Sequence, residues 1–429
     1  MLQPFSQSER IDQVRYDIRG PLNARALELE AHGHKIIKLN IGNPALFGFT
    51  TPAHMREAIA ANLSNSEAYV HQQGILPARE AVARSLEARG MRVSPNQVYI
   101  GNGVSELIDL TLRALLNTGD EVLLPAPDYP LWTAAVHLNS GKPVYYDCMP
   151  ENNGLPDPAQ IEALITKRTR ALVIINPNNP NGAVYPKELV EQLAQIAERY
   201  GLILMSDEIY EGLLFDDAKF HSAAPLVRDT LAITFSGLSK VHRACGYRVG
   251  WFTLSGALKP ARDYIKALDV LAALRLCSNV AGQWAVPAAF DGIDTCTPLC
   301  QPGGRLYESR RALLEGVARS NYLTTATPMG AMYAFPGVDT TRLHNFDDQV
   351  FAMTMLEREH ILIVPGSSFN VRYRNHFRMT LLPEAPVIRK VLAAMESVLA
   401  EQAGDLLGAR PLALTNAVPF SAEPCASFA

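Results

Sequence analysis

The chain has 429 residues, of which 48% are hydrophobic and 19% are charged, and its formal net charge is -4. This is the composition of an ordinary globular protein, and the length predicts more than one packed core. The chain has no basic stretch that could bind along the phosphate backbone of a nucleic acid, and no apolar run is long enough to span a bilayer. Neither nucleic acid nor a membrane is therefore an expected partner.

The opening segment, "MLQPFSQSERIDQVRYDIRG", is polar and lacks the apolar core of a secretory signal, so we expect a cytoplasmic protein. Cysteines at positions 148, 245, 277, 296, 300 and 425 form no CxxC pair and have no partnered histidines. Neither a zinc site nor a disulfide framework is indicated, and no metal is expected. Buried, reduced thiols are the simpler interpretation.

Seven short apolar runs between Val98 and Phe252 alternate with longer amphipathic segments: "QVYIG", "DEVLLPAP", "KPVYYDC", "RALVIINP", "GLILMSDE", "LAITFSG" and "RVGWFTL". This alternation predicts an α/β fold whose large domain has a mostly parallel central sheet covered by helices. The loops beyond the carboxyl ends of such strands build ligand sites, so the residues that close these runs are the candidates for chemistry.

A second, smaller α+β domain is predicted after the large one. After "CQPGGRLYESRRALLEGV" we expect a long helix, followed by strands near "GAMYAFP", "ILIVPG" and "HFRMTLL". The expected division is an N-terminal arm at 1–45 that joins the small domain, a large domain at 46–299, a small domain at 300–400 and a mobile tail at 401–429.

Two strand ends suggest a phosphorylated, flat ligand. "YIGNGVSELIDLTLRALL" predicts a strand, a glycine turn and a helix, so the N–H groups of Gly103, Val104 and Ser105 would face a phosphate at a positive helix end. An ordinary βα turn would give the same pattern. In "PAPDYPLW", Tyr129 stands between prolines and suits stacking on a flat ring, and a packing role is the alternative.

The next two strand ends add an amide and a carboxylate. In "INPNNPNG", Asn179 can donate its amide to a ligand oxygen or belong to a simple turn. In "GLILMSDEIYEGLLF", an apolar strand runs into Asp207, whose carboxylate is costly to bury without a cation. A helix N-cap is the alternative for Asp207. Tyr210 follows three residues later and can lie over the same edge.

The stretch "FSGLSKVHRACGYRVGW" supplies an amine and a guanidinium. Lys240 follows the predicted strand among Ser236, Gly237 and Ser239, which are small enough to admit a bulky group. Arg248 comes eight positions later and can hold a phosphate dianion with two hydrogen bonds. A solvated lysine and a surface arginine are the alternatives.

Together these groups match pyridoxal 5′-phosphate: a phosphate cradle, a stacking ring, donors to a ring oxygen, an acid for a ring nitrogen and an amine for an aldehyde. On this interpretation Lys240 forms a Schiff base with the cofactor, and Asp207 keeps the pyridine nitrogen protonated. The amine of Lys240, once released, can move a proton at the substrate Cα.

Six motifs and their order resemble the class I/II aminotransferases of pyridoxal-phosphate fold type I: "GNGVSE", "PAPDYPLW", "NPNNPNG", "SDEIY", "SGLSK" and "GYRVGW". The resemblance covers nearly the whole chain, to about residue 400. More narrowly, "YDIRGP", "IGNGVSELI", "PAPDYPLWTAAV" and "PGGRLYE" are similar to bacterial glutamate–pyruvate (alanine) aminotransferases.

The resemblance implies a role for each matched residue. It makes Lys240 the Schiff-base lysine and Asp207 the partner of the ring nitrogen. It implies that Tyr69 reaches the phosphate of a neighbouring subunit, which means a homodimer with active sites at its interface. The other implied contacts are ring stacking by Tyr129, bonds to the 3′-oxygen from Asn179 and Tyr210, phosphate contacts from Gly103, Val104, Ser239 and Arg248, and substrate contacts from Gly42, Asn179, Arg378 and Tyr16.

Two positions depart from the family pattern. The family commonly has a hydroxyl three residues before the lysine, where this chain has Gly237, so the phosphate hydroxyl is expected to be Ser239 or else Ser236. The usual Asn-Pro-Thr-Gly is here Asn-Pro-Asn-Gly, and we expect Asn181 to alter the turn only slightly.

The implied reaction is a ping-pong transamination in which L-alanine leaves as pyruvate and 2-oxoglutarate collects the amino group as L-glutamate. Arg378 would orient both substrates, and Arg275 is a candidate anchor for the distal carboxylate, with an exposed helix arginine as the alternative. Rival functions are an aminotransferase for valine, methionine or aromatic substrates, a carbon–sulfur β-lyase, an inactive scaffold, and a cofactor-sensing regulator. The regulator would need a DNA-binding module, which the sequence does not indicate.

Overall fold

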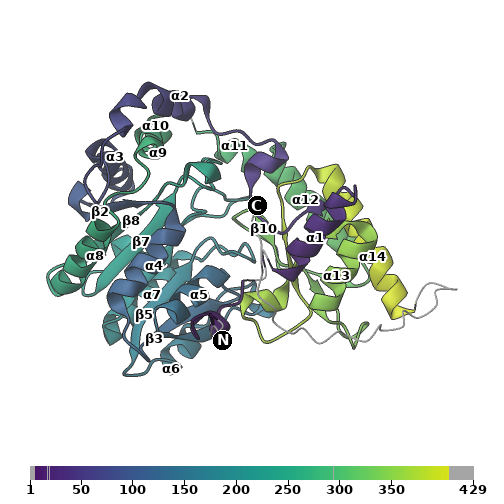
Figure 1. Ribbon diagram of the computed structural model, residues 1–429. Helices are drawn as coiled ribbons and strands as arrows, with labels where there is room; N and C mark the ends of the chain where they lie inside the picture. Colours follow the sequence, from purple (N-terminus) through teal and green to yellow (C-terminus); the bar gives the residue numbers. More distant parts are fainter. Residues whose placement is uncertain (1–4, 17, 19, 293, 405–429) are drawn as a thin grey trace.

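The structure, a computed structural model, describes residues 5–16, 18, 20–292 and 294–404. Its centre is a seven-stranded sheet in the order β2-β8-β7-β6-β5-β3-β4 (Figure 1). Strand β8 runs antiparallel to β2 and β7, and the other neighbouring strands are parallel. All seven strands predicted from the sequence are confirmed: β2 Val98–Gly101, β3 Glu121–Ala126, β4 Lys142–Asp147, β5 Thr169–Ile175, β6 Ile203–Asp207, β7 Leu231–Gly237 and β8 Gly250–Gly256.

Helices cover both faces of this sheet because successive strand side chains point to opposite sides. Val122 and Leu124 pack with α4, α5 and α8 on one face, and Leu123 packs with α6 and α7 on the other. Around β2, helices α2, α3, α9 and α10 build a further core (Figure 1). The bounds are α2 Ala53–Ala61, α3 Leu76–Glu87, α4 Val104–Leu115, α5 Pro130–Leu138, α6 Pro158–Ala163, α7 Lys187–Tyr200, α8 Arg262–Leu274, α9 Val280–Gln283 and α10 Ala285–Asp291.

The C-terminal part contains short strands and longer helices, as an α+β unit requires. The long helix lies within "CQPGGRLYESRRALLEGV" rather than after it, and strands occur in each of the three predicted stretches. Strand β14 pairs antiparallel with β10 and β13, and β9 pairs with β11. The bounds are α11 Thr297–Cys300, α12 Arg305–Arg319, α13 Asp348–Glu359, α14 Ala385–Ala403, β9 Leu323–Thr324, β10 Tyr333–Ala334, β11 Gly337–Val338, β12 Ile361–Leu362, β13 Val364–Pro365 and β14 Phe377–Thr380.

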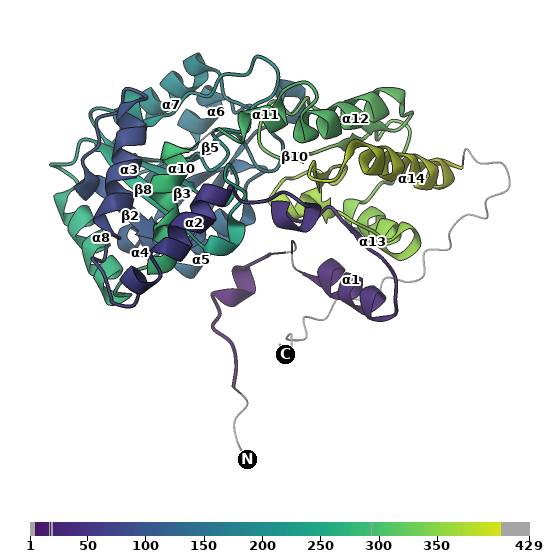
Figure 2. The ribbon, with the colours of Figure 1, turned by 90° about the horizontal axis from the view of Figure 1, so that it is seen from above.

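The N-terminal segment packs on this C-terminal part. Strand β1 (Ile37–Lys38) pairs in parallel with β12, and helix α1 (Pro21–Ala31) lies beside α13 (Figure 2). One hydrophobic core includes residues of α1, α12, α13 and α14 and extends to Tyr210. These contacts support the predicted arm, and the domain limits stay a prediction. Of the predicted tail, residues 401–403 complete α14 and residues 405–429 lie outside the described part.

The cysteines that the structure describes lie mostly inside the fold. Cys148, Cys296 and Cys300 are buried, and Cys245 and Cys277 are partly buried. Cys425 is outside the described residues. Within the described ranges, no helix is long and apolar enough to cross a bilayer.

Candidate active site

Residues suited to chemistry gather at the carboxyl edge of the central sheet. Asp207 ends β6, and Lys240 follows the end of β7. Because β8 is antiparallel, its beginning lies at this same edge, where Gly250 pairs with Gly237. Arg248, which directly precedes β8, is thereby brought to the edge that carries Lys240. The order of the strands therefore explains how residues from distant motifs meet.

The amine of Lys240 points toward the N-terminal arm. Its Nζ donates a hydrogen bond to the carbonyl of Gly42 at 2.8 Å. Gly42 itself lies tightly against Tyr333, since a Cβ added at Gly42 would be 2.0 Å from the Tyr333 Oη. A side chain at position 42 therefore has no space, which explains the glycine at this position.

The carboxylate of Asp207 is buried without a charged partner in hydrogen-bond contact among the described residues. It accepts hydrogen bonds from Trp132 Nε1 at 3.2 Å and from the backbone N–H of Ile209 at 3.4 Å. Burial raises the pKa of Asp207 to about 6, and the Trp132 hydrogen bond acts in the opposite direction. Among the described residues no helix begins directly after Asp207, so the N-cap alternative is wrong. The carboxylate is suited to a ligand cation.

Two buried phenols lie between this acid and the arm. Tyr210 donates a hydrogen bond from its hydroxyl to that of Tyr333 at 3.5 Å. Burial raises the pKa of Tyr210 well above its ordinary value. For Tyr333 burial also opposes ionisation, but the charges of Lys240 and Arg378 outweigh it and lower the pKa of this phenol. Tyr333 thus lies within the electrostatic reach of both cations.

Arg378 lies on β14 and is 1% exposed. Its Nη1 donates to the Asn179 side-chain oxygen at 3.0 Å, and its Nη2 donates to the carbonyl of Asn40. The guanidinium carbon lies 4.5 Å from the ring centre of Tyr333 and 4.9 Å from that of Phe369. Its Nε is buried and has no hydrogen-bond partner in the described structure. One donor of a buried cation therefore remains for an anionic ligand.

Tyr129 is fixed from both domains. Its hydroxyl lies 3.2 Å from that of Tyr16, and burial raises the pKa of the Tyr129 phenol well above its ordinary value. The neighbouring Asp128 accepts hydrogen bonds from Thr133 at 2.7 Å and from Asn370 at 2.8 Å. Asp128 is fully buried, and burial raises its pKa to about 7. The contact with Asn370 ties the loop that carries Tyr129 to the C-terminal part.

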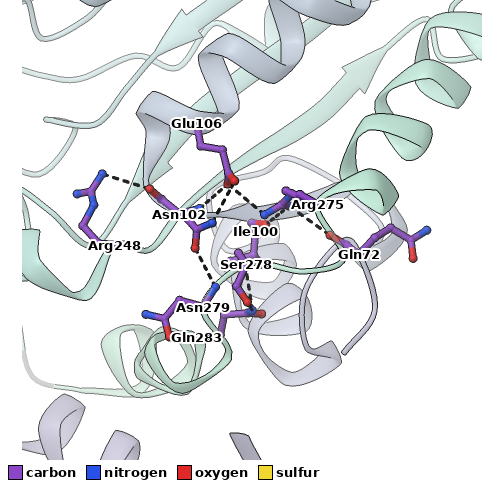
Figure 3. Close-up of polar contacts among 9 residues, drawn as sticks. All are labelled: Gln72, Ile100, Asn102, Glu106, Arg248, Arg275, Ser278, Asn279 and Gln283. Atoms are coloured by element: carbon purple, nitrogen blue, oxygen red, sulfur yellow. Dashed lines mark hydrogen bonds and ion pairs between the residues drawn. The ribbon is translucent and has the colours of Figure 1, made fainter. Parts of the chain in front are cut away.

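The predicted phosphate cradle begins helix α4. Gly103 has φ +86° and precedes Val104, and no side chain caps this helix start. A Cβ added at Gly103 would lie 2.4 Å from Nη2 of Arg248. Arg248 donates to the carbonyl of Asn102 at 3.2 Å (Figure 3). It also donates to the carbonyl of Cys245 at 3.0 Å. The turn therefore brings a guanidinium directly against a helix start, an arrangement suited to an anion.

The replacement of a hydroxyl by Gly237 has a steric reason. A Cβ at this position would lie 2.8 Å from the Cα of Gly250 in the next strand. The hydroxyl of Ser236 bonds to Glu211 at 3.3 Å, which leaves partly buried Ser239 as the better candidate for the phosphate. The side-chain oxygen of Asn181 accepts from the Ala183 N–H at 2.9 Å within the turn, and its amide donates to the carbonyl of Gly154 at 3.3 Å.

Arg275 is not the exposed helix arginine that one sequence interpretation suggested. It follows α8 directly, its side chain is only 15% exposed, and it pairs with Glu106 at 3.0 Å (Figure 3). It also donates to the carbonyls of Ile100 at 2.8 Å and Gln72 at 3.2 Å. The exposed-helix alternative is wrong. Both Nη atoms are engaged inside the chain, whereas the buried Nε has no hydrogen-bond partner among the described residues, and the anchor role stays a prediction. Burial lowers the pKa of Arg275, and the charge of Glu106 opposes this.

Tyr69 lies apart from these contacts and is 79% exposed. Its predicted position in a neighbouring subunit's site stays a prediction.

Sequence reasoning missed several residues of the site. Trp132 lies one helical turn after Tyr129, and that spacing could have indicated that both side chains lie on the same face of the helix. Asp128 directly precedes Tyr129, and an acid at a strand end was a usable signal. Tyr333 lies in an apolar strand where a core tyrosine gives the same pattern, and Asn40 is an ordinary polar residue beside a glycine, so neither carried a specific signal.

The comparison with known proteins defines the class to which the site belongs. Residues 34–394 match the sequence profile of the family "Aminotransferase class I and II", and the chain belongs to this family of aminotransferases, whose members depend on pyridoxal phosphate.

Within the family, the chain is similar to proteins with an alanine-related name. It is 47% identical to the glutamate-pyruvate aminotransferase AlaA of Escherichia coli (strain K12), over 91% of this chain and 97% of that protein. It is 44% identical to an alanine aminotransferase of Mycobacterium bovis, over 91% of each chain. A solved aminotransferase structure from Escherichia coli has a TM-score of 0.91 and 46% identity, and the match covers 93% of this chain and 99% of that one. These similarities agree with the resemblance inferred from the motifs.

Proposed function

We propose that this chain binds pyridoxal 5′-phosphate and transfers an amino group between L-alanine and 2-oxoglutarate, with pyruvate and L-glutamate as products. The observation that carries the proposal is the convergence of an amine, Lys240, a buried acid, Asp207, and a buried guanidinium, Arg378, at one end of the fold. The printed names of the relatives at 47% and 44% identity support alanine as the amino donor.

The residues present fit the cofactor in three respects. The glycine turn at Gly103 and the guanidinium of Arg248 suit a phosphate, because a Cβ at Gly103 would fill this cradle. The raised pKa of Asp207 means that a nearby protonated ring nitrogen would relieve a cost of burial. The rigid ring of Tyr129 and the phenol of Tyr210 supply a stacking surface and a hydrogen-bond donor.

When bound, pyridoxal phosphate supplies an aldehyde that takes up the amino group and a ring that withdraws electrons from the bonds at the substrate Cα. Asp207 would hold a proton on the ring nitrogen by charge pairing. Lys240 Nζ would accept the proton from the substrate Cα when the donor loses its amino group. It would donate a proton to Cα when the acceptor substrate takes the amino group up. In the structure this amine donates a hydrogen bond to the Gly42 carbonyl at 2.8 Å, so it lies beside the N-terminal arm.

Arg378 would bind the α-carboxylate of each substrate. Its free Nε and the fixed contacts of its other nitrogens to Asn179 and Asn40 set the direction of the guanidinium plane. The close contact between Gly42 and Tyr333 limits the room beside this carboxylate.

Two measurements on the purified full-length protein test the proposal. Visible absorption should show bound cofactor, and it should change on addition of L-alanine and return on addition of 2-oxoglutarate; Lys240→Ala should not turn over. Amino donors are then compared with 2-oxoglutarate as the acceptor. Valine, methionine or an aromatic amino acid used better than alanine would contradict the donor assignment, and formation of a thiol from a cysteine conjugate would favour the β-lyase.

We also propose that the enzyme is a cytoplasmic homodimer in which Tyr69 completes the partner's phosphate site. Mixed dimers of Lys240→Ala and Tyr69→Ala chains test this sharply. Each hybrid would have one site with both substitutions and one site with neither, so a hybrid dimer should have about half the activity of the wild type, and an equal mixture that pairs at random about a quarter. No recovery on mixing, or a monomer in sedimentation, would refute the shared site. Cell fractionation tests the location.

A further inference from the structure

Glu106 poses an electrostatic problem for the proposed phosphate cradle. It lies in the first turn of α4, the helix whose start would bind the phosphate. A carboxylate at this place competes with the phosphate for the positive end of the helix and repels a dianion. A Cβ added at Gly101, two residues before Gly103, would lie 2.9 Å from Glu106 Oε2, so this carboxylate is close to the turn.

The same carboxylate shapes the turn. Its oxygens accept the backbone N–H of Asn102 at 2.6 Å and the Asn102 side-chain amide at 3.0 Å (Figure 3). With its side chain fixed, Asn102 accepts from the N–H of Asn279 at 2.8 Å and, through its carbonyl, from Arg248 at 3.2 Å. Glu106 therefore holds the segment that in turn holds the phosphate-binding guanidinium.

Arg275 resolves the conflict between these two effects. Its Nη1 pairs with Glu106 Oε2, while Nη2 is anchored by the carbonyls of Ile100 and Gln72, so the cation cannot leave the carboxylate without losing fixed contacts (Figure 3). The Glu106 side chain is 28% exposed and that of Arg275 only 15%, which reduces screening by water. The pair keeps the hydrogen bonds to Asn102 while it cancels the charge that opposes a phosphate.

We propose that Arg275 is a positioning residue for the cofactor phosphate: it neutralises Glu106 and fixes it against Asn102, so that the helix start and Arg248 accept a dianion. This inference rests on the proposed function, since it concerns the phosphate of pyridoxal phosphate. It replaces the role of a distal-carboxylate anchor that the sequence suggested.

The test compares cofactor binding with and without the phosphate group. The full-length protein, freed of cofactor, is titrated with pyridoxal phosphate and with pyridoxal, and tryptophan fluorescence reports binding. Arg275→Gln should raise the dissociation constant for pyridoxal phosphate about tenfold or more, because it leaves an uncompensated carboxylate beside the phosphate. The constant for pyridoxal should change less than about twofold. Inorganic phosphate should likewise compete less well.

Removal of the repelling charge should rescue the defect. The double variant Glu106→Gln with Arg275→Gln should bind pyridoxal phosphate within about threefold of the wild type, since the amide keeps an acceptor for Asn102 without the charge. Arg113→Gln is the matched control, because Arg113 pairs with Asp109 at 2.5 Å on the exposed side of the same helix. That variant should leave both constants unchanged.

Several results would overturn the inference. The first is an unchanged affinity of Arg275→Gln for pyridoxal phosphate, and the second is an equal loss of affinity for both ligands without rescue by the double variant. The third is a raised KM for 2-oxoglutarate as the sole effect, which would favour the role of a distal-carboxylate anchor. If Arg275→Gln does not fold, Arg275→Lys serves instead, and a loss that is not specific to the phosphorylated ligand refutes the proposal. A wild-type protein that binds neither ligand would instead refute the proposed function.

Discussion

Gly42→Ala is the substitution that most directly probes the geometry around Lys240. The new Cβ would lie 2.0 Å from Tyr333 Oη and 2.7 Å from its Cζ, whereas ordinary contacts are 3.4–4 Å. Tyr333 is 3% exposed and lies against Tyr210 and Arg378, so its ring has little freedom to withdraw. Overpacking of this kind costs about 1–3 kcal/mol, and we expect the free energy of unfolding to fall by about 2 kcal/mol.

The same displacement should reach the chemistry. The Gly42 carbonyl accepts the hydrogen bond from Lys240, so movement of this segment shifts the amine as well as Tyr333. A displacement of about 1 Å can reduce kcat/KM about a hundredfold. Urea unfolding and steady-state rates with L-alanine measure the two effects. Stability within about 0.5 kcal/mol of the wild type together with unchanged kcat/KM would refute the reasoning.

A matched control lies in the loop between Lys240 and Arg248. A Cβ added at Gly246 has no atom within 4 Å and the backbone there is not left-handed, so Gly246→Ala introduces a methyl group without a collision. We expect its free energy of unfolding to stay within about 0.5 kcal/mol of the wild type. An equal loss in both variants would show that the effect comes from replacing a glycine by alanine rather than from the contact with Tyr333.

Three further predictions concern buried charges. Folded Asp128 keeps its proton to a pH of about 7 whereas the unfolded carboxyl releases it near 3.8, so its contribution to stability falls as pH rises through this window. In Asp128→Asn, the decrease in the free energy of unfolding between pH 4 and pH 8 should be smaller than in the wild type by about 4 kcal/mol, as measured by urea unfolding. Trp132→Phe removes a donor to Asp207 and raises the pKa of this acid further, so kcat should fall about tenfold and the acidic limb of its pH profile should move to higher pH. Arg378→Lys loses the planar contact and should raise KM for alanine and 2-oxoglutarate together by about a hundredfold, in steady-state assays, while cofactor absorption is retained.

The sequence predicted the central sheet well because its strands are buried on both faces. Such strands are nearly continuous apolar runs, and each run here stops at residues that favour turns. Asp207 and Lys240 could be placed at one edge for the same reason, since the carboxyl ends of parallel strands share an edge. For these residues local pattern and topology carry the same information.

Contacts between distant segments could not be predicted in this way. Asp128 and Asn370 are 242 residues apart, and their hydrogen bond depends on how two separately formed cores pack together. Arg275 shows the same limit, because its position after a helix predicts solvent or a ligand equally well. Its actual partners, Glu106 and the carbonyls of Ile100 and Gln72, come from three other segments. Local periodicity contains no information about contacts between segments that are distant in the sequence.

The two carboxylates at this edge of the sheet are treated in opposite ways, and the difference matches the charges of the proposed ligand. Glu106 is paired with a cation of its own chain, at the place where the ligand is negative. Asp207 accepts N–H groups from Trp132 and Ile209, and its raised pKa marks a charge that still lacks compensation, at the place where a ring nitrogen would be positive. Burial of an acid without a cation is costly, and a cationic ligand group beside Asp207 would remove that cost. On the proposed function, this arrangement of charges suits a ligand with a cationic ring at one end and a phosphate at the other.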